Sequence, residues 1–228
     1  MTEGAQGPGP PHSFARITVI AGVNGAGKSS IVGETIRARG GAYFNPDEEA
    51  RALRAEDPGL PHAAANARAW DAGRAGLERA IARREDFAFE TTLGGATIAM
   101  LLGRALDTGI EVVMRYVGLD SPERHIARVR ARVARGGHDI PEAKIRERYR
   151  RSREHLVALL PRLTSLLVYD NSVEGDPDAG VAPALRLLLH IATGRIIAVA
   201  PAVEIPVWAH PIVSAAILSD ERQGGRAG

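Results

Sequence analysis

The sequence predicts an α/β fold with a doubly wound, mainly parallel sheet of five strands. Five short runs rich in Val, Ile, Phe and Tyr alternate with segments of helical periodicity. Several runs are apolar on both faces, as strands of a buried parallel sheet are. Regular alternation of strand and helix is typical of a sheet covered by helices. The predicted strands are residues 16–21, 42–45, 87–90, 110–119 and 165–170.

Polar residues follow the end of every predicted strand, which is the second observation behind this fold class. In open α/β sheets, ligands bind beyond the carboxyl ends of the strands. The chemistry of the protein is therefore expected at one edge of the sheet. The segments expected there are residues 22–29, 45–47, 90–92, 119–121 and 170–172.

The predicted helices come from periodicity and from helix-start residues. Residues 62–85 and 96–108 carry apolar side chains at i, i+3 and i+4 spacing. Another helix is predicted to start after Asn45, because Asn suits the N-cap and proline suits the first helical position. Acidic residues in a first turn also interact favourably with the helix dipole.

The chain is expected to form one main domain with two flanking segments. Residues 1–15 are rich in Gly and Pro and are interpreted as a disordered lead-in, and residues 16–190 as the catalytic domain. Residues 191–228 are interpreted as a C-terminal extension. Within it, residues 196–218 are long enough to cross a bilayer, but three prolines and a glutamate favour a packed segment and no membrane association.

Composition excludes several classes of site and partner. The chain has no cysteine, which excludes disulfides and thiolate nucleophiles and suits a reducing, cytoplasmic setting. Its net charge is only +2, so a nucleic-acid partner is not expected from overall charge.

The residues after the first predicted strand, "GVNGAGKS", match the phosphate-binding pattern G-x-x-x-x-G-K-[ST] in full. Glycines let the backbone amides curl towards phosphates, Lys28 reaches the β- and γ-phosphates, and the Ser29 hydroxyl ligates Mg²⁺. ATP and Mg²⁺ are the expected cofactors, in a sheet of P-loop NTPase topology similar to adenylate kinase. The expected nucleotide-binding residues are Gly22, Val23, Asn24, Gly25, Ala26, Gly27, Lys28, Ser29 and Ser30.

A phosphate loop serves hydrolases and kinases alike, and other residues must separate the two. The sequence contains neither the D-x-x-G switch motif nor the N-K-x-D nucleobase-recognition motif of GTPases. Asp170 ends an apolar run as a hydrolase metal ligand would, but Asn171 follows it instead of a glutamate. We favour the interpretation that Asp170 caps the next turn.

Asp47 is the candidate general base of a kinase. It follows the second predicted strand, beside the phosphate loop in a sheet of this class, where it could accept the proton of an acceptor hydroxyl. The alternative is that Asp47 is only a first-turn carboxylate of the helix that starts at Pro46. Both interpretations can hold together.

Residues 121–154 form a basic, helical, lid-like segment. Its eleven basic and five acidic residues give a net charge of +6, and four arginines recur along one helix face. We expect Arg128 and Arg132 to stabilise phosphate charge, whereas a solvated face or an RNA-binding patch remain alternatives. His138, in the Gly-Gly turn that follows, is interpreted as a turn cap, with a role as base as the alternative.

Taken in order, "GVNGAGKS", "FNPDE", "FAFETTLGG", "RVRARV", "GGHDIPE" and "VYDNS" resemble the zeta-toxin family, in particular the branch often labelled predicted ABC-type ATPase. The resemblance covers about residues 16–175. Better-understood members are bacterial toxins that phosphorylate the 3′-hydroxyl of UDP-N-acetylglucosamine and are held by an antitoxin protein.

The resemblance implies roles for named residues of this chain. Asp47 would be the base, Lys28 would bind phosphate, and Arg128 and Arg132 would stabilise it. The expected substrate-binding residues are Asn45, Glu90, Thr91 and Thr92. The sequence departs from the toxins at Thr91, where they carry glycine, and "GGHDIP" has no clear counterpart in them, so the acceptor can differ.

The leading hypothesis is therefore an ATP-dependent kinase for a nucleotide sugar or another small hydroxyl acceptor. Two alternatives stay open on the residues alone. One is a nucleotide-gated RNA- or protein-binding ATPase that uses residues 121–154, and the other is an ATP hydrolase that uses Asp170.

Overall fold

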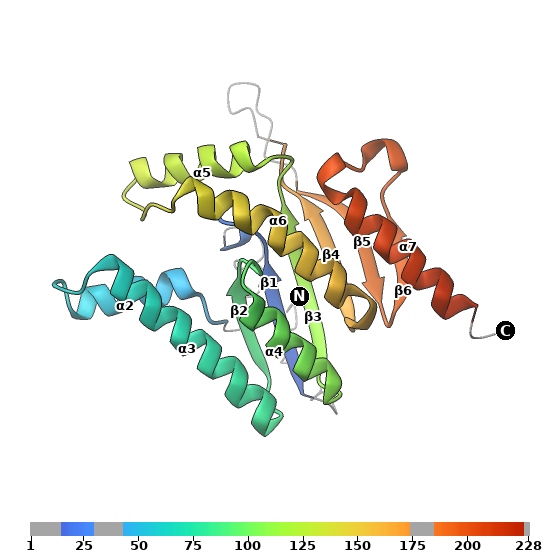
Figure 1. The fold of residues 1–228 in the computed structure, drawn as a ribbon, viewed down its shortest axis with the longest axis horizontal. Coiled ribbons are helices and arrows are strands. Elements are labelled where there is room, and N and C mark those ends of the chain that lie inside the picture. Colours follow the sequence, from blue (N-terminus) through green and yellow to red (C-terminus); the bar gives the residue numbers. More distant parts are fainter. Residues whose placement is uncertain (1–14, 30–42, 174–184, 226–228) are drawn as a thin grey trace, which may run out of the picture.

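A six-stranded, mainly parallel sheet forms the centre of the protein (Figure 1). The computed structural model describes residues 15–29, 43–173 and 185–225. The strands lie in the order β2-β1-β3-β4-β5-β6. Their bounds are Arg16–Ala21 for β1, Phe87–Thr91 for β2, Glu111–Gly118 for β3, Ser165–Asp170 for β4, Arg186–Ala192 for β5 and Arg195–Val199 for β6.

Strands β1 to β4 confirm four of the five predicted strands, and all of their pairings are parallel. In the described part of the run 42–45, residues 43–45, Phe44 forms an isolated parallel bridge with Phe89 and no longer strand. That bridge still places Phe44 beside β2, next to the edge at which β1 ends. The remaining residues of the first connection, 30–42, lie outside the described residues.

The sheet has six strands and not five, which corrects the predicted count. β5 pairs antiparallel with β4, and β6 pairs antiparallel with β5. Thr193 and Gly194 join them and both have positive φ, as a two-residue hairpin with a primed turn requires. The boundary expected after residue 190 therefore falls inside β5, and β6 belongs to the same sheet as the phosphate loop.

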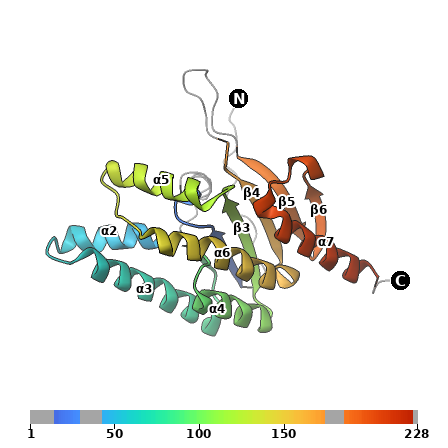
Figure 2. The ribbon, with the colours of Figure 1, turned by 45° about the horizontal axis from the view of Figure 1, so that its top comes forward.

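The helices cover the sheet as the periodicity predicts, with α4, α6 and α7 lying side by side across one face (Figure 2). Their bounds are Pro46–Glu56 for α2, His62–Arg83 for α3, Ala96–Asp107 for α4, Pro122–Ala134 for α5, Glu142–Leu159 for α6 and His210–Gly224 for α7. Short 3-10 turns span Leu160–Arg162, Ala202–Glu204 and Val207–Ala209.

Local sequence explains where two site-forming helices begin. The Asn45 side chain accepts a hydrogen bond from the amide of Asp47, and the Ser121 side chain accepts one from the amide of Arg124. A proline follows each cap at the start of the helix. The predicted N-cap role of Asn45 is confirmed.

The C-terminal segment packs on the hydrophobic core of the sheet. Trp208, Ile212 and Ala216 are buried in the same apolar cluster as β1, β3 and β4. Among the described residues, no helix combines the length and the apolarity needed to cross a membrane.

Candidate active site

The phosphate loop leaves β1 and turns sharply at glycines. Gly22, Gly25 and Gly27 all have positive φ, a conformation that other residues adopt only with strain. A Cβ on Gly22 would lie 2.2 Å from the Val117 carbonyl oxygen, so no side chain fits there. Ser30, the last expected nucleotide contact, lies outside the described residues.

Three carbonyl oxygens of the loop are held by side chains. The acceptors are the carbonyls of Val23, Asn24 and Ala26, and the donors are Lys28 Nζ at 3.3 Å, His125 Nδ1 at 2.8 Å and Asn171 Nδ2 at 2.9 Å, respectively. His125 comes from α5 and Asn171 follows β4. Sequence reasoning missed both roles, because no local pattern connects these residues with the loop.

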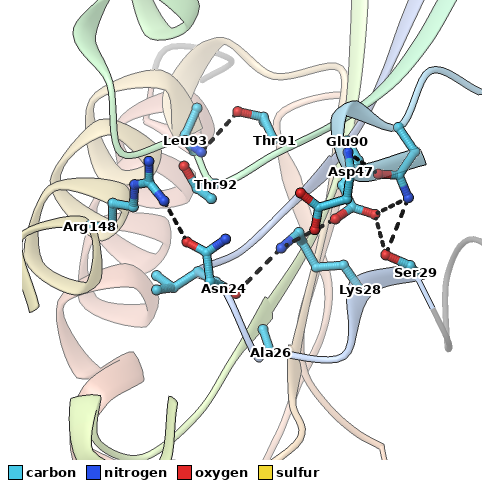
Figure 3. Close-up of polar contacts among 12 residues, drawn as sticks. Asn24, Ala26, Lys28, Ser29, Asp47, Glu90, Thr91, Thr92, Leu93 and Arg148 are labelled. Carbon is cyan, nitrogen blue, oxygen red and sulfur yellow. Dashed lines mark hydrogen bonds and ion pairs between the residues drawn. The ribbon is translucent and has the colours of Figure 1, made fainter. Parts of the chain in front are cut away.

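Lys28 and Ser29 share one carboxylate, that of Glu90 at the end of β2 (Figure 3). The Lys28 ammonium lies 3.4 Å from one oxygen of Glu90, and the Ser29 hydroxyl donates to the other at 2.7 Å. Glu90 and Lys28 are buried. Glu90, expected among the substrate contacts, therefore lies directly beside the residues expected to bind phosphate and Mg²⁺.

Asn45 and Asp47 stand beside this cluster with different exposures. Asn45 is buried, and its amide lies 3.4 Å from the Ser29 hydroxyl. Asp47 is open to solvent on one side, and its Oδ2 lies 3.4 Å from Nη1 of Arg132. The helix-start geometry and the position of a base at the site thus coexist at Asp47.

Two arginines of α5, Arg128 and Arg132, form polar contacts with other segments of the chain. Arg128 donates to the Asn171 carbonyl at 2.8 Å, and Arg132 contacts Asp47 and donates to the His138 carbonyl at 3.2 Å. These contacts direct both guanidinium groups to Asn171, Asp47 and His138 and not to an outward stripe.

Arg148 of α6 is a site residue that the sequence analysis did not single out. Its Nη1 donates to the side-chain oxygen of Asn24 in the phosphate loop at 2.8 Å (Figure 3). Burial lowers the pKa of its guanidinium, against the opposing effect of the Asp47 and Glu147 carboxylates. The spacing of Lys144 and Arg148, four residues apart on a helix face, is the signal that could have identified it.

Thr91 and Thr92 shape the turn that follows β2. Their hydroxyl oxygens accept hydrogen bonds from the amides of Leu93 and Gly94. A Cβ on Gly94 would lie 2.7 Å from Cγ of Arg148, so the glycine lets α6 approach this turn.

A cavity of 680 Å³ opens beside the phosphate loop, between α3 and α6. Every expected substrate-binding residue lines it: Asn45, Glu90, Thr91 and Thr92. Asp47 and Lys28 line it as well, so the candidate base and the lysine expected to bind phosphate lie at the same space. Arg128 and Arg132 do not line it, whereas Arg148 does.

The far walls of the cavity carry aromatic and basic side chains. Asn66, Trp70 and Arg74 recur every four residues along α3, and the Arg74 guanidinium lies 5.7 Å from the centre of the Trp70 ring. The wall from α6 presents Lys144, Arg148 and Arg151. The space is large enough for a small organic substrate.

The donor set beside Ser29 fits a magnesium ion. Mg²⁺ is usually held by one or two carboxylates together with substrate phosphates and several waters. A serine hydroxyl and the Glu90 carboxylate in direct contact provide such a set. The described residues contain no cluster of three or more His, Cys, Asp or Glu side chains of the kind that holds a metal ion alone.

Asp170 does not line the cavity. Its carboxylate accepts hydrogen bonds from Trp208 Nε1, the Ser172 hydroxyl and Arg186 Nη2. Asp170 is buried, Arg186 begins β5, and Trp208 lies in the turn before α7. The turn-capping interpretation of Asp170 agrees with the bond from Ser172.

Comparison with known proteins supports the same fold. No family model matches the chain. A protein of Haemophilus influenzae, described only as uncharacterised, is 32% identical over 133 residues, which are 56% of this chain and 88% of that protein.

Two solved structures show where the fold recurs. One is a chain of the AvrRxo1-ORF1:AvrRxo1-ORF2 complex with ATP, with a TM-score of 0.54 and 13% identity over 89% of this chain. The match spans 64% of that chain, less than two thirds of its length. The other is a putative kinase from Chloroflexus aurantiacus, with a TM-score of 0.52 and 14% identity over 73% of this chain and 95% of that one. At 13% and 14% identity, both structures show that the fold of this chain recurs in them.

Proposed function

We propose that the protein is a zeta-toxin-like, ATP-dependent kinase for a small hydroxyl-bearing acceptor. The chain belongs to the family of the H. influenzae protein. Its fold recurs in a putative kinase from Chloroflexus aurantiacus. One observation carries the proposal. The phosphate loop and a separate 680 Å³ cavity meet at Lys28, Asp47 and Glu90. A hydrolase needs only a water beside the phosphates, whereas a kinase needs room for a second substrate.

ATP would bind along the loop, with its terminal phosphates at the backbone amides and at Lys28. Ser29 and Glu90 would hold Mg²⁺, whose contribution is to neutralise charge on the transferred phosphoryl group. Lys28 and Ser29 now engage Glu90, so phosphate and metal binding would exchange these contacts for new ones.

In the transfer step, the Asp47 carboxylate would accept the proton of the acceptor hydroxyl. The hydroxyl oxygen forms a bond to the γ-phosphorus while the bond to the bridging oxygen breaks, and ADP leaves. Arg132, beside Asp47, and Arg148, beside Asn24, would stabilise the developing charge. Arg128 would do so after releasing the Asn171 carbonyl.

A nucleotide sugar such as UDP-N-acetylglucosamine is the acceptor that we propose first. The basic side chains on α6 suit a diphosphate, and the half-exposed Trp70 offers a face for a ring. The inward contacts of Arg128 and Arg132 favour this function over RNA binding by α5.

An antitoxin partner and a cytoplasmic location remain part of the proposal. AvrRxo1-ORF1 was crystallised with a second protein, AvrRxo1-ORF2. We extend to this chain only the idea that it binds a partner protein. Co-expression with neighbouring reading frames and co-purification would test it.

The kinase proposal is tested by incubating the protein with ATP, Mg²⁺ and a panel of UDP-sugars and analysing the products by mass spectrometry. We expect one acceptor to gain a phosphoryl group and Asp47→Asn to lower its transfer rate by about 10²- to 10⁴-fold while ATP still binds. Glu49→Gln, on the same helix turn but outside the cavity, is the matched control. ATP turnover that is equally fast without any acceptor would argue against a kinase.

A further inference from the structure

A tight turn between α5 and α6, residues 136–141, closes on the side chain of Arg132. Gly136 has a φ of +89°, and the amide of Gly137 donates to the Arg132 carbonyl at 3.0 Å. A Cβ on Gly137 would lie 2.8 Å from Cγ of Arg132. The two glycines therefore allow the turn to wrap around this arginine.

Both ends of the turn are fixed. The Arg132 guanidinium donates to the His138 carbonyl at 3.2 Å. Ile140 is buried in a cluster with Val23 of the phosphate loop and Ile145 of α6. The position of His138 is thus determined by contacts on either side of it.

His138 lines the cavity, and its imidazole makes no hydrogen bond within the described residues that would stabilise the fold. In the described part of the chain, only the carbonyl of His138 has a hydrogen-bond partner. The expected turn-capping role is therefore not what the ring does. Burial lowers its pKa, against the opposing effect of Asp47, so the ring is neutral near pH 7 and offers one donor and one acceptor.

We propose that His138 determines acceptor specificity by hydrogen-bonding a second polar group of the acceptor, close to the hydroxyl that Asp47 deprotonates. One guanidinium, that of Arg132, contacts both the Asp47 carboxylate and the His138 carbonyl, which holds the two residues at neighbouring positions on the cavity wall. The acceptor class is then a polyhydroxylated compound, such as a sugar, and not a mono-alcohol. This inference rests on the proposed kinase function.

Steady-state kinetics of His138→Ala and His138→Gln test the inference. The probes are UDP-N-acetylglucosamine, UDP-N-acetylgalactosamine, UDP-glucose and UDP-galactose, which differ from one another at C2, at C4 or at both positions of the sugar. We expect His138→Ala to raise the KM of the preferred acceptor about tenfold, as loss of one hydrogen bond does, and to narrow the preference between epimers. kcat and the KM of ATP should change less than about threefold.

His138→Gln keeps a donor and an acceptor and should restore most of the acceptor affinity. His62→Ala, a histidine at the start of α3 outside the cavity lining, is the control, and a thermal melt of each variant monitors folding. Acceptor-dependent transfer with an unchanged acceptor KM in His138→Ala overturns this inference alone, as does a fall in kcat without a change in KM. A wild-type protein that phosphorylates no sugar overturns the proposed function with it.

Discussion

Two buried carboxylates lie at the carboxyl ends of strands of the same sheet and differ in what surrounds them. Glu90 is the penultimate residue of β2, on one side of the phosphate loop, and its partners are Lys28 and Ser29. Asp170 ends β4 on the other side, and its partners are Trp208, Ser172 and Arg186. Glu90 lines the cavity and Asp170 does not.

The difference shows that position at the carboxyl edge of a sheet does not by itself make an acid catalytic. The donors around Glu90 belong to a motif that serves nucleotide, so its contacts can be exchanged for a ligand. The donors around Asp170 come from the residues after β4, from β5 and from the turn before α7, and they attach these segments to one another. We infer that Glu90 serves the reaction and Asp170 the fold, and four experiments test this division.

The largest effect is expected from Glu90→Gln. The substitution keeps the shape but removes the charge that faces Lys28 and Ser29, so phosphoryl transfer should fall by about 10²- to 10³-fold. Stability should change little. Transfer rates and thermal melts measure the two effects. Glu111→Gln is the control, because Glu111 begins β3 and so lies at the edge of the sheet opposite to Glu90. Full activity in Glu90→Gln would show that the Glu90 carboxylate takes no part in phosphoryl transfer.

Trp208→Ala should have the largest effect on stability. The indole is buried, packs 6.2 Å from the Tyr116 ring between centroids, and covers Gly118 so closely that a Cβ there would lie 2.4 Å from it. We expect the free energy of unfolding to fall by about 3–5 kcal/mol. Urea denaturation measures the loss, and activity per folded molecule should be retained. Trp208→Phe, which removes the donor but keeps most of the volume, should lose much less.

A pH dependence is expected on the loop side, through His125. Burial lowers the pKa of His125 to about 4, against its hydrogen bond to Asn24, which raises it. Because the pKa is lowered in the folded state, the folded protein loses stability as the pH falls from the usual value of 6.5 towards 4. The full loss is on the order of 3 kcal/mol.

Urea denaturation at pH 7 and pH 5 measures this loss. His125→Asn keeps a donor for the Asn24 carbonyl but cannot titrate, so its stability should vary less with pH than that of the wild-type protein. Equal pH dependence in the two proteins would show that another group is responsible.

The smallest effect is expected from Asp170→Asn. Loss of the charge leaves Arg186 and Trp208 with a weaker acceptor, so the free energy of unfolding should fall by about 2 kcal/mol. ATP-dependent activity of the folded protein should stay within about threefold of wild type. Asp120→Asn, a more exposed acid after β3, is the matched control. Abolished ATP turnover at unchanged stability would revive the hydrolase hypothesis.

The sequence predicted the parts of the fold whose signal is local. Apolar runs identified β1 to β4, and Asn45 and Pro46 identified the start of α2. β6 escaped because four of its five residues are exposed, so it lacks the pattern of a buried strand. The Thr193-Gly194 pair was the available signal for its hairpin.

The candidate site divides in the same way. A contiguous motif predicted the phosphate loop, the position after the second predicted strand indicated Asp47, and the resemblance added Glu90. His125 and Asn171 could not be found, because each reaches the loop from a segment about 100 or more residues away in sequence. Such contacts depend on how helices pack on the sheet, and no spacing rule encodes them.

The anchors that His125 and Asn171 provide on the carbonyls of Asn24 and Ala26 have a consequence for how nucleotide binds. With these carbonyls held from outside, the curvature of the loop belongs to the folded chain. The conformational entropy of the loop is then lost during folding and not during association, which leaves more of the contact energy for affinity. Loosening a single anchor should therefore weaken nucleotide binding without removing any group that touches the nucleotide.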